Sequence, residues 1–310
     1  VHSVTLYVNS VQVFNSTTDK VLPDENRMIN GFTDYEELTR TRRLIMRSYK
    51  LPGNRLRLLH PNENRGAVTI DEERDYHFRY VLEDNFGNRR TYQFIVKGKR
   101  QDIPEYKPEA NEMLYWNRTN VIQKPGMELV VPRYYVYEDV PLRTDMRGDS
   151  SHIAFDYILD AGRTPIHSYC DLSIGLRHMP VADTTKYYIV QKAGKWRSSM
   201  GGKYANGWIK TRVRSLGTFS VDVDTIAPQI TPIGQGGWRT SRNIRFRIKD
   251  MESGIGSYKV YIDGKFVLFG LKKGILVIQN PEKVKKGVSH KLEVTVTDQC
   301  GNMTRKEYKF

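Results

Sequence analysis

The sequence predicts an all-β protein of tandem Ig-like β-sandwich modules, with one helical insertion in the first module. Short runs of alternating apolar and polar residues recur along the chain, turn residues separate them, and one turn phrase occurs twice. With 310 residues, of which 39% are hydrophobic, the chain can bury two or three modest cores. We therefore expect three modules, at residues 1–103, 104–224 and 225–310.

The repeated phrase is D-x-x-G-N, in "LEDNFGN" and again in "VTDQCGN". An aspartate can accept hydrogen bonds from the backbone N–H groups that follow it, glycine adopts positive φ freely, and asparagine tolerates the left-handed region. Alternating apolar residues flank each phrase, so each is predicted to join the last two strands of a module. The predicted turn residues are Asp84, Gly87, Asn88, Asp298, Gly301 and Asn302.

The first module also shares a hairpin with the last, because "SVTLYVNSVQVF" at residues 3–14 aligns with "SYKVYIDGKFVLF" at residues 257–269. In the later copy an alternating strand with Ile244, Phe246 and Ile248 precedes the hairpin. Only two residues precede Ser3, and a sandwich without its opening strands would expose a sheet edge and an unfilled core. We therefore expect the first sandwich to be truncated at its N-terminus, with further polypeptide upstream of Val1.

The insertion is inferred from spacing, because Ser3 and Asp84 lie 81 positions apart whereas Ser257 and Asp298 lie 41 apart. The extra residues contain a helix signal near 33–49, where Thr33 is followed by Glu36 as in a capping box. Several arginines accompany this helix, which favours a solvated lid over the sandwich more than an anion site.

The middle module reads as strands alone. Its entry is marked by Pro104, and the next boundary is marked by Pro228 and Pro232. Six short segments have strand character, namely "MELVVP", "IAFDYIL", "LSIGLR", "KYYIVQKAGKW", "GWIKTRVRS" and "GTFSVDVD". Three all-β modules in series argue for a string of sandwiches.

Charge is concentrated in the last module. Of a net charge of +14, residues 225–310 carry +9, with 16 Lys and Arg against 7 Asp and Glu. Arg245, Arg247 and Lys249 alternate with apolar residues and are predicted to share one outward strand face. A nearby loop adds Lys283, Lys285 and Lys286. Such a face suits an anionic polymer, although a solubilising surface is the simpler interpretation; nucleic acid is not expected, because no aromatic platform is interleaved with the basic row.

No catalytic residue, metal ligand or cofactor is assigned to this chain. The H-x-x-x-D at His152 and Asp156 would place the two side chains about 13 Å apart on one strand face, too far to share a metal. Cys170 and Cys300 lack metal-ligand spacing, and whether they form a disulfide stays open. No apolar run reaches the length of a transmembrane segment.

Several blocks carry a resemblance to a known family. "NGFTDYEELTRTRR", "PGNRLRLL", "RGAVTIDEERDYHFRYVLEDNFGN", "DTIAPQITPIGQGGW" and "HKLEVTVTDQCGN" resemble the region that follows the peptidase domain in lysostaphin-type zinc metallopeptidases of Gram-negative envelopes. The family's zinc motifs belong to an upstream domain, so no catalytic residue is transferred to this chain.

The resemblance implies a protein of the periplasm, outer membrane or cell surface of a Gram-negative bacterium. This chain would be a non-catalytic accessory region that positions an upstream peptidase domain or binds peptidoglycan or another anionic envelope polymer. Zinc would be bound only by the upstream domain. The alternative is a stand-alone surface binding or adhesion protein, or a structural scaffold of the outer envelope.

Overall fold

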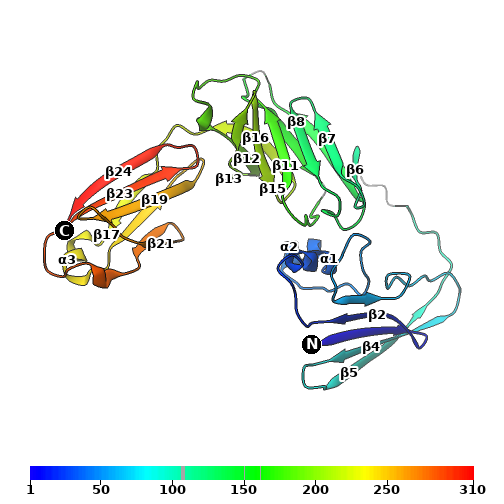
Figure 1. Cartoon of the computed structure of the whole chain (residues 1–310). Helices are drawn as coiled ribbons and strands as arrows, with labels where there is room; N and C mark the ends of the chain where they lie inside the picture. Colours follow the sequence, from blue (N-terminus) through cyan, green and yellow to red (C-terminus); the bar gives the residue numbers. More distant parts are fainter. Residues whose placement is uncertain (106–108, 150, 161) are drawn as a thin grey trace.

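The computed structural model describes residues 1–105, 109–149, 151–160 and 162–310. It confirms the all-β class: every strand pair among these residues is antiparallel, and the helices are few and short. Figure 1 shows the strands gathered into three successive units along the chain. None of the described helices is long and apolar enough to cross a membrane.

The first unit is one five-stranded sheet in the order β3-β2-β1-β4-β5. Its strands are β1 (Ser3–Val8), β2 (Val11–Thr17), β3 (Leu59–Pro61), β4 (Asp75–Glu83) and β5 (Arg89–Lys97). Leu6, Phe14 and Tyr76 are buried on one face of this sheet, where the segment between β2 and β3 packs through Leu56 and neighbouring apolar residues. On the same face, Phe94 of β5 stays 47% exposed, so this half of the sheet is only partly covered.

The insertion between β2 and β3 is less helical than expected. It contains η1 (Asn26–Met28), α1 (Ile29–Phe32) and α2 (Tyr35–Thr41). The α2 N-cap is Asp34, whose side chain accepts from the backbone N–H of Glu37, and not the predicted Thr33. The helix ends at Arg42, which adopts a left-handed conformation, and Leu44 beyond it is 66% exposed. The predicted helix near 33–49 is therefore wrong in its extent, because α2 ends after 7 residues, about two turns.

The insertion also contacts the middle unit and is not simply a solvated lid. The Arg27 guanidinium donates to the backbone carbonyl of Ile166, and the Tyr137 hydroxyl donates to the carbonyl of Arg27. The backbone N–H of Gly53 donates to the carbonyl of Tyr137 at 2.7 Å. The inserted residues thus form the first joint of the molecule.

The middle unit is a sandwich of two sheets, in the orders β13-β12-β16-β10-β9-β6 and β14-β15-β11-β8-β7. Leu129, Ile174, Ile189 and Phe219 are fully buried between them. Its strands are β6 (Glu112–Leu114), β7 (Asn120–Lys124), β8 (Met127–Val131), β9 (Val140–Arg147), β10 (Asp156–Asp160), β11 (Cys170–Gly175), β12 (Tyr187–Ala193), β13 (Trp196–Ser199), β14 (Lys203–Ala205), β15 (Trp208–Val213) and β16 (Gly217–Val223), with η2 at Thr184–Lys186.

The last unit is a second sandwich, with sheets β17-β18-β22-β21 and β20-β19-β23-β24. Phe246, Leu292 and Val294 are fully buried in its core, beside Trp238. Its elements are β17 (Gln229–Ile233), η3 (Gln235–Gly237), α3 (Trp238–Ser241), β18 (Arg245–Lys249), β19 (Ile255–Ile262), β20 (Lys265–Phe266), β21 (Phe269–Lys272), β22 (Ile275–Ile278), η4 (Pro281–Lys283), β23 (Lys291–Asp298) and β24 (Met303–Lys309).

The repeated hairpins have equivalent positions in the two outer units. Ser3 of β1 pairs with Glu83 of β4, and Ser257 of β19 pairs with Thr297 of β23, one residue before the aspartate of each D-x-x-G-N phrase. The hairpin turns agree too. Asn9 and Ser10 have φ of 48° and 68°, and Asp263 and Gly264 have φ of 49° and 76°; a type I′ turn requires such positive values at both positions. Both cysteines are buried and free, so the open disulfide question is settled against a bridge in this structure.

Candidate metal centre at the joint between the middle and last modules

The two D-x-x-G-N turns have the same internal hydrogen bonds. The Asp84 carboxylate accepts from the backbone N–H groups of Phe86 and Asn88 and from the Asn88 side-chain amide. In the last unit the Asp298 carboxylate accepts from Cys300 N–H and from both the backbone N–H and side-chain amide of Asn302, all at 2.8 Å. The glycines have φ of 81° and 80°, a conformation that favours glycine. The turn is therefore a local structure that the motif alone produces.

Two further aspartates meet the second turn but have no counterpart at the first. Asp224 directly follows β16, Asp250 directly follows β18, and Asp298 ends β23. One carboxylate oxygen from each of these three residues lies within 4.8 Å of the others. Asp224 and Asp298 are buried, with 1% and 4% of their surface exposed, and Asp250 is partly exposed. Three strand ends from two modules thus bring three carboxylates together at the joint.

Hydrogen bonds fix these carboxylates in place. Asp224 accepts from both the backbone N–H and the hydroxyl of Ser253, at 3.0 and 2.5 Å. Asp250 accepts from Glu252 N–H and Gly254 N–H through Oδ1. The Asn302 amide donates to the backbone carbonyl of Asp224 at 3.0 Å and so links the two modules. All of these donors are neutral groups.

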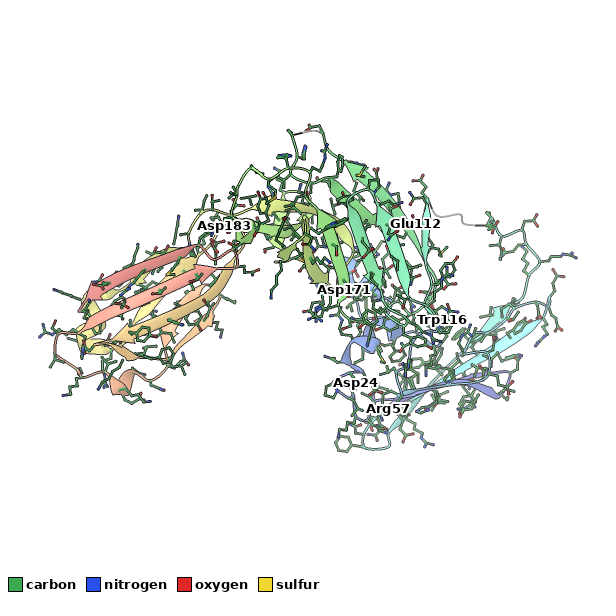
Figure 2. The ribbon with its side chains drawn as sticks, turned by 45° about the horizontal axis from the view of Figure 1, so that its top comes forward. Asp24, Arg57, Glu112, Trp116, Asp171 and Asp183 are labelled. Carbon is green, nitrogen blue, oxygen red and sulfur yellow. The ribbon has the colours of Figure 1, made fainter. Side chains whose placement is uncertain are left out.

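The cluster lacks a cationic partner. Within the described part of the chain, no Lys, Arg or His makes a salt bridge to any of the three aspartates. At the same joint, Lys186 donates to the carbonyl of Cys300 and lies 3.8 Å from the Asp183 carboxylate. Figure 2 labels Asp183 where the middle unit meets the last. At such separations, carboxylate pairs repel by a few kcal/mol at the effective dielectric of a protein.

The pKa values of the two turn aspartates, Asp84 and Asp298, are shifted in opposite directions. Burial raises the pKa of Asp298, and the neighbouring Asp224 and Asp250 charges raise it further, against the hydrogen bonds of Asn302. The same hydrogen bonds lower the pKa of Asp84, which has no such neighbours. The surroundings of Asp298 therefore disfavour its ionised form, whereas those of Asp84 favour it.

The arrangement fits a hard divalent cation. Ca²⁺ prefers carboxylate and carbonyl oxygens at about 2.3–2.6 Å in flexible geometry, so two oxygens on opposite sides of the ion lie about 4.6–5.2 Å apart. The three carboxylate oxygens all lie within 4.8 Å of one another, so none is farther from another than two ligands of one Ca²⁺ ion can be. The Oδ2 atom of Asp250 accepts no hydrogen bond from any described residue and is free to coordinate. Mg²⁺ fits less well because it requires a strict octahedron and shorter bonds.

The predicted basic residues lie on two separate surfaces. Arg245, Arg247 and Lys249 are exposed on one face of β18, and the pairing of β18, β22 and β21 puts Lys272 on the same face. We call these four side chains the basic face. Lys283 and Lys285 line a pocket with His290 at another part of the module, and Lys286 is exposed beside them.

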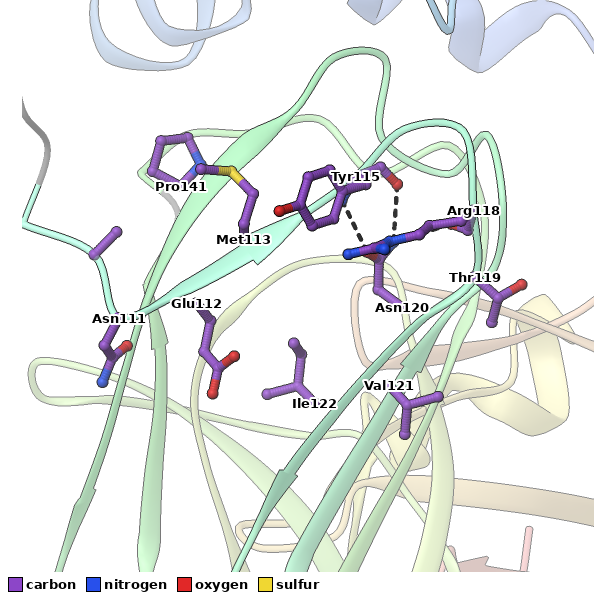
Figure 3. A pocket seen from close by; sticks show the side chains of 11 residues that line it. Asn111, Glu112, Met113, Tyr115, Arg118, Thr119, Asn120, Val121, Ile122 and Pro141 are labelled. Atoms are coloured by element: carbon purple, nitrogen blue, oxygen red, sulfur yellow. Dashed lines mark hydrogen bonds between the residues drawn. The ribbon is translucent and has the colours of Figure 1, made fainter.

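A hollow of about 810 Å³ lies at the edge of the middle unit, beside β6 and β7 (Figure 3). Two of its polar side chains are already engaged: Asn120 accepts from the backbone N–H of Tyr115 and donates to its carbonyl, and Arg118 stacks over the Tyr115 ring at 3.8 Å. We assign no chemistry to it.

Comparisons with known proteins give one family match. Residues 111–224, less than half of the chain, match the family model of the Zu5-like domain. No curated protein matches the chain at a significant level.

Two similar solved structures are bacterial adhesins. One is a Ca²⁺-stabilised adhesin that helps an Antarctic bacterium reach out and bind ice; it is 10% identical over 99% of this chain and 88% of that chain, with a TM-score of 0.19. The other is a 1.5-MDa bacterial ice-binding adhesin described for host cell surface retention; it is 9% identical over 99% of this chain and 84% of that chain, with a TM-score of 0.17. Scores this low mean that the folds do not superpose as wholes.

These findings correct one expectation. The description of the chain as metallopeptidase-related and peptidoglycan-directed is wrong, since the family model that matches residues 111–224 is that of the Zu5-like domain.

Proposed function

We propose that this chain is a segment of a cell-surface binding or adhesion protein in which Ca²⁺ fixes the middle and last modules relative to each other. The observation that carries the proposal is the convergence of Asp224, Asp250 and Asp298 at the joint. A protein that holds a partner at a distance from the cell needs joints that keep their direction under load. An ion shared by two modules provides such a joint because it binds only when the modules are docked.

The joint without an ion is electrostatically unfavourable. The buried carboxylates of Asp224 and Asp298 and the partly exposed carboxylate of Asp250 repel one another. Only neutral hydrogen-bond donors, among them the Asn302 amide, hold them in place. Ca²⁺ would replace this repulsion with attraction. At a concentration one hundred times its dissociation constant, an ion that binds only the folded state adds about 2.7 kcal/mol of stability.

The experiment compares Asp250→Asn with the native chain and with Asp84→Asn. Differential scanning calorimetry in Ca²⁺ and in chelator reports stability, and small-angle X-ray scattering reports the angle between modules. We expect Ca²⁺ to raise the melting temperature of the native chain and to narrow its distribution of shapes. Asp250→Asn should lose both responses yet match or exceed the native stability in chelator, because the asparagine keeps the hydrogen bonds and removes a repelling charge.

The control variant Asp84→Asn changes the same motif where no other aspartates converge. It should keep the full Ca²⁺ response of the native chain. The proposal fails if the native chain shows no heat of Ca²⁺ binding and no change in melting. It also fails if Asp84→Asn abolishes the response as completely as Asp250→Asn does.

A second function is favoured by the basic face. Arg245, Arg247, Lys249 and Lys272 are exposed on one sheet, and no described acidic side chain forms a salt bridge with any of them. We propose that this face retains an anionic polymer by charge, with little selectivity for its sequence or repeat.

Its test is retention on a sulfated polysaccharide over a range of salt concentrations. Replacing Arg245, Arg247 and Lys249 with glutamine should lower the salt needed for elution, because exposed charges are screened within about 10 Å at 0.1 M salt. A matched variant that neutralises Lys203, Lys210 and Lys259 removes the same charge from other positions. Equal losses in the two variants would show that net charge, and not this face, holds the polymer.

A further inference from the structure

The last module has a pocket at the end opposite the joint. β19 starts at Ile255, which pairs with Asp298 at the joint, and ends at Ile262, which pairs with Leu292. Seven strand steps separate these points, roughly 24 Å at the usual rise. The β19–β20 turn therefore marks the distal tip, and a cavity of about 860 Å³ lies there between this turn and the loop that leads into β23.

The walls of this tip pocket are apolar and unusually exposed at its mouth. Ile262 and Val284 are buried at its base. Phe266, Leu268 and Val288 also line it, and they are 62%, 53% and 43% exposed. Large apolar side chains this exposed, and gathered around one opening, are typical of a surface that is covered by a partner.

Three lysines are among the polar residues that line the pocket. Lys265, Lys283 and Lys285 line it, and none of them forms a salt bridge with a described residue. The one carboxylate of the lining, Asp263, is already bonded by His290 at 2.6 Å and by the backbone N–H of Lys291. The three ammonium groups are thus available to an outside anion.

A histidine holds the two sides of the pocket together. The buried His290 ring contacts the Asp263 carboxylate through Nδ1 and the carbonyl of Lys285 through Nε2, at 2.6 and 2.8 Å. The carbonyl and the ionised carboxylate can only accept, so the ring makes both bonds at once only in its protonated form. This link ties the β19–β20 turn to the lysine-bearing loop, so the pocket has a defined shape.

We propose that the tip pocket docks onto an anionic lipid surface, with Phe266, Leu268 and Val288 inserted among the acyl chains and the lysines bound to the headgroup phosphates. Apolar side chains that project outward, with lysines beside them, match the interface of a bilayer, where an apolar layer lies directly beneath a layer of negative charge. A small soluble anion would satisfy the lysines but leave the three apolar side chains in water. This inference goes beyond the proposed joint and does not depend on Ca²⁺.

The experiment is co-sedimentation of the whole chain with vesicles of phosphatidylcholine, with and without phosphatidylglycerol, in the presence of chelator. We expect binding only when phosphatidylglycerol is present. Replacing Lys265, Lys283 and Lys285 with glutamine should weaken binding roughly fivefold for each charge, on the order of a hundredfold together. Phe266→Ser should weaken it about tenfold, since it removes apolar area that inserts.

The control variant replaces Lys203, Lys210 and Lys259 with glutamine, which removes equal charge from other exposed positions and leaves the tip and the basic face intact. It should change vesicle binding only slightly, and unchanged hydrogen exchange across the last module in every variant confirms that this module is folded. Equal losses in the tip and control variants would overturn the proposal, as would full binding by Phe266→Ser. Displacement by inorganic phosphate as effective as that by soluble short-chain phosphatidylglycerol would show that the pocket takes a free anion, and would overturn it too.

Discussion

In the first module the sheet that leads into Asp84 is covered by an insertion, whereas in the last module the sheet that leads into Asp298 is covered by a second sheet. The two sheets share their hairpin and their register, and the two turns share their hydrogen bonds. The layer that covers each sheet determines which additional side chains lie beside the D-x-x-G-N turn. The second sheet of the last module contributes Asp250 directly after β18, whereas among the described residues the insertion contributes no equivalent carboxylate to the first turn.

The D-x-x-G-N motif is therefore enough to form the turn, but a cluster of carboxylates forms only where the surrounding elements supply further aspartates. Asp84 has a lowered pKa because Asn88 and backbone N–H groups stabilise its anion. Asp298 has the same bonds and a raised pKa because it is buried beside two like charges. Each module also makes its joint differently, by packing of the insertion around Tyr137 in one case and by converging carboxylates in the other.

The largest expected effect tests the covering layers themselves. Phe246→Ala removes a fully buried ring between the two sheets of the last module and should cost about 3–5 kcal/mol of its stability. Phe94→Ala removes a ring that stacks on Phe78 at 5.1 Å but is already 47% exposed, so it should cost under about 1.5 kcal/mol. Hydrogen exchange measured by mass spectrometry in urea resolves the two modules. Equal costs would mean that the face of the first sheet is covered as fully as that of the last.

A smaller effect tests the joint that the insertion makes. A Cβ atom at Gly31 would lie 2.6 Å from the ring of Tyr137, which is buried and bonded to Arg27. Gly31→Ala should therefore displace that ring and cost about 1–3 kcal/mol, with faster exchange on both sides of the first joint. The matched control is Gly236→Ala in the last module, where a Cβ meets no atom within 4 Å and should cost almost nothing. A neutral Gly31→Ala would show that the insertion does not bind the middle module closely.

Much of the fold was predictable from local pattern. All six segments read as strands in the middle module are strands, because alternation and flanking turns are properties of each segment alone. The short strands β6, β13 and β14, with three or four residues each, carry no such pattern and exist through their partners. The extent of α2 was missed for a related reason: Leu44 has helical spacing but lies exposed beyond a left-handed residue.

The site was predictable only in part. Asp298 stands out because its motif is repeated, but Asp224 and Asp250 lie 74 and 48 positions earlier and share no motif with it. The available signal was that Asp224 and Asp250 each lie at the end of a predicted strand, and strand ends that meet at one joint bring their aspartates together. Which ends meet depends on how two modules dock, and a pattern within a single segment does not contain that information.

The smallest expected effect tests the opposite end of the repeated hairpin. In the first module, Asn9 accepts from the backbone N–H of His77; in the last, Asp263 accepts from Lys291 N–H in the equivalent place and also bonds His290. Burial lowers the pKa of His290, but the bonds to Asp263 and to the Lys285 carbonyl outweigh it, and the net pKa is raised. The bond to His290 lowers the pKa of Asp263. The charged pair is thus present in the last module and absent from the first.

The sign of the pH dependence follows from these directions. A histidine whose folded pKa is raised adds stability that is fully present below its unfolded pKa of about 6.5 and is lost as pH rises through the folded value. Urea unfolding of the last module, followed in chelator by Trp238 fluorescence in a chain whose other three tryptophans are replaced by phenylalanine, should show stability falling as the pH rises above about 6.5. Asp263→Asn keeps the backbone hydrogen bond that Asn9 makes in the first module. It should reduce the fall in stability that the native chain shows above about pH 6.5. If the unfolding free energy of that variant fell with pH as steeply as that of the native chain, the pH dependence would belong to another group. The two hairpin ends would then not differ in this respect.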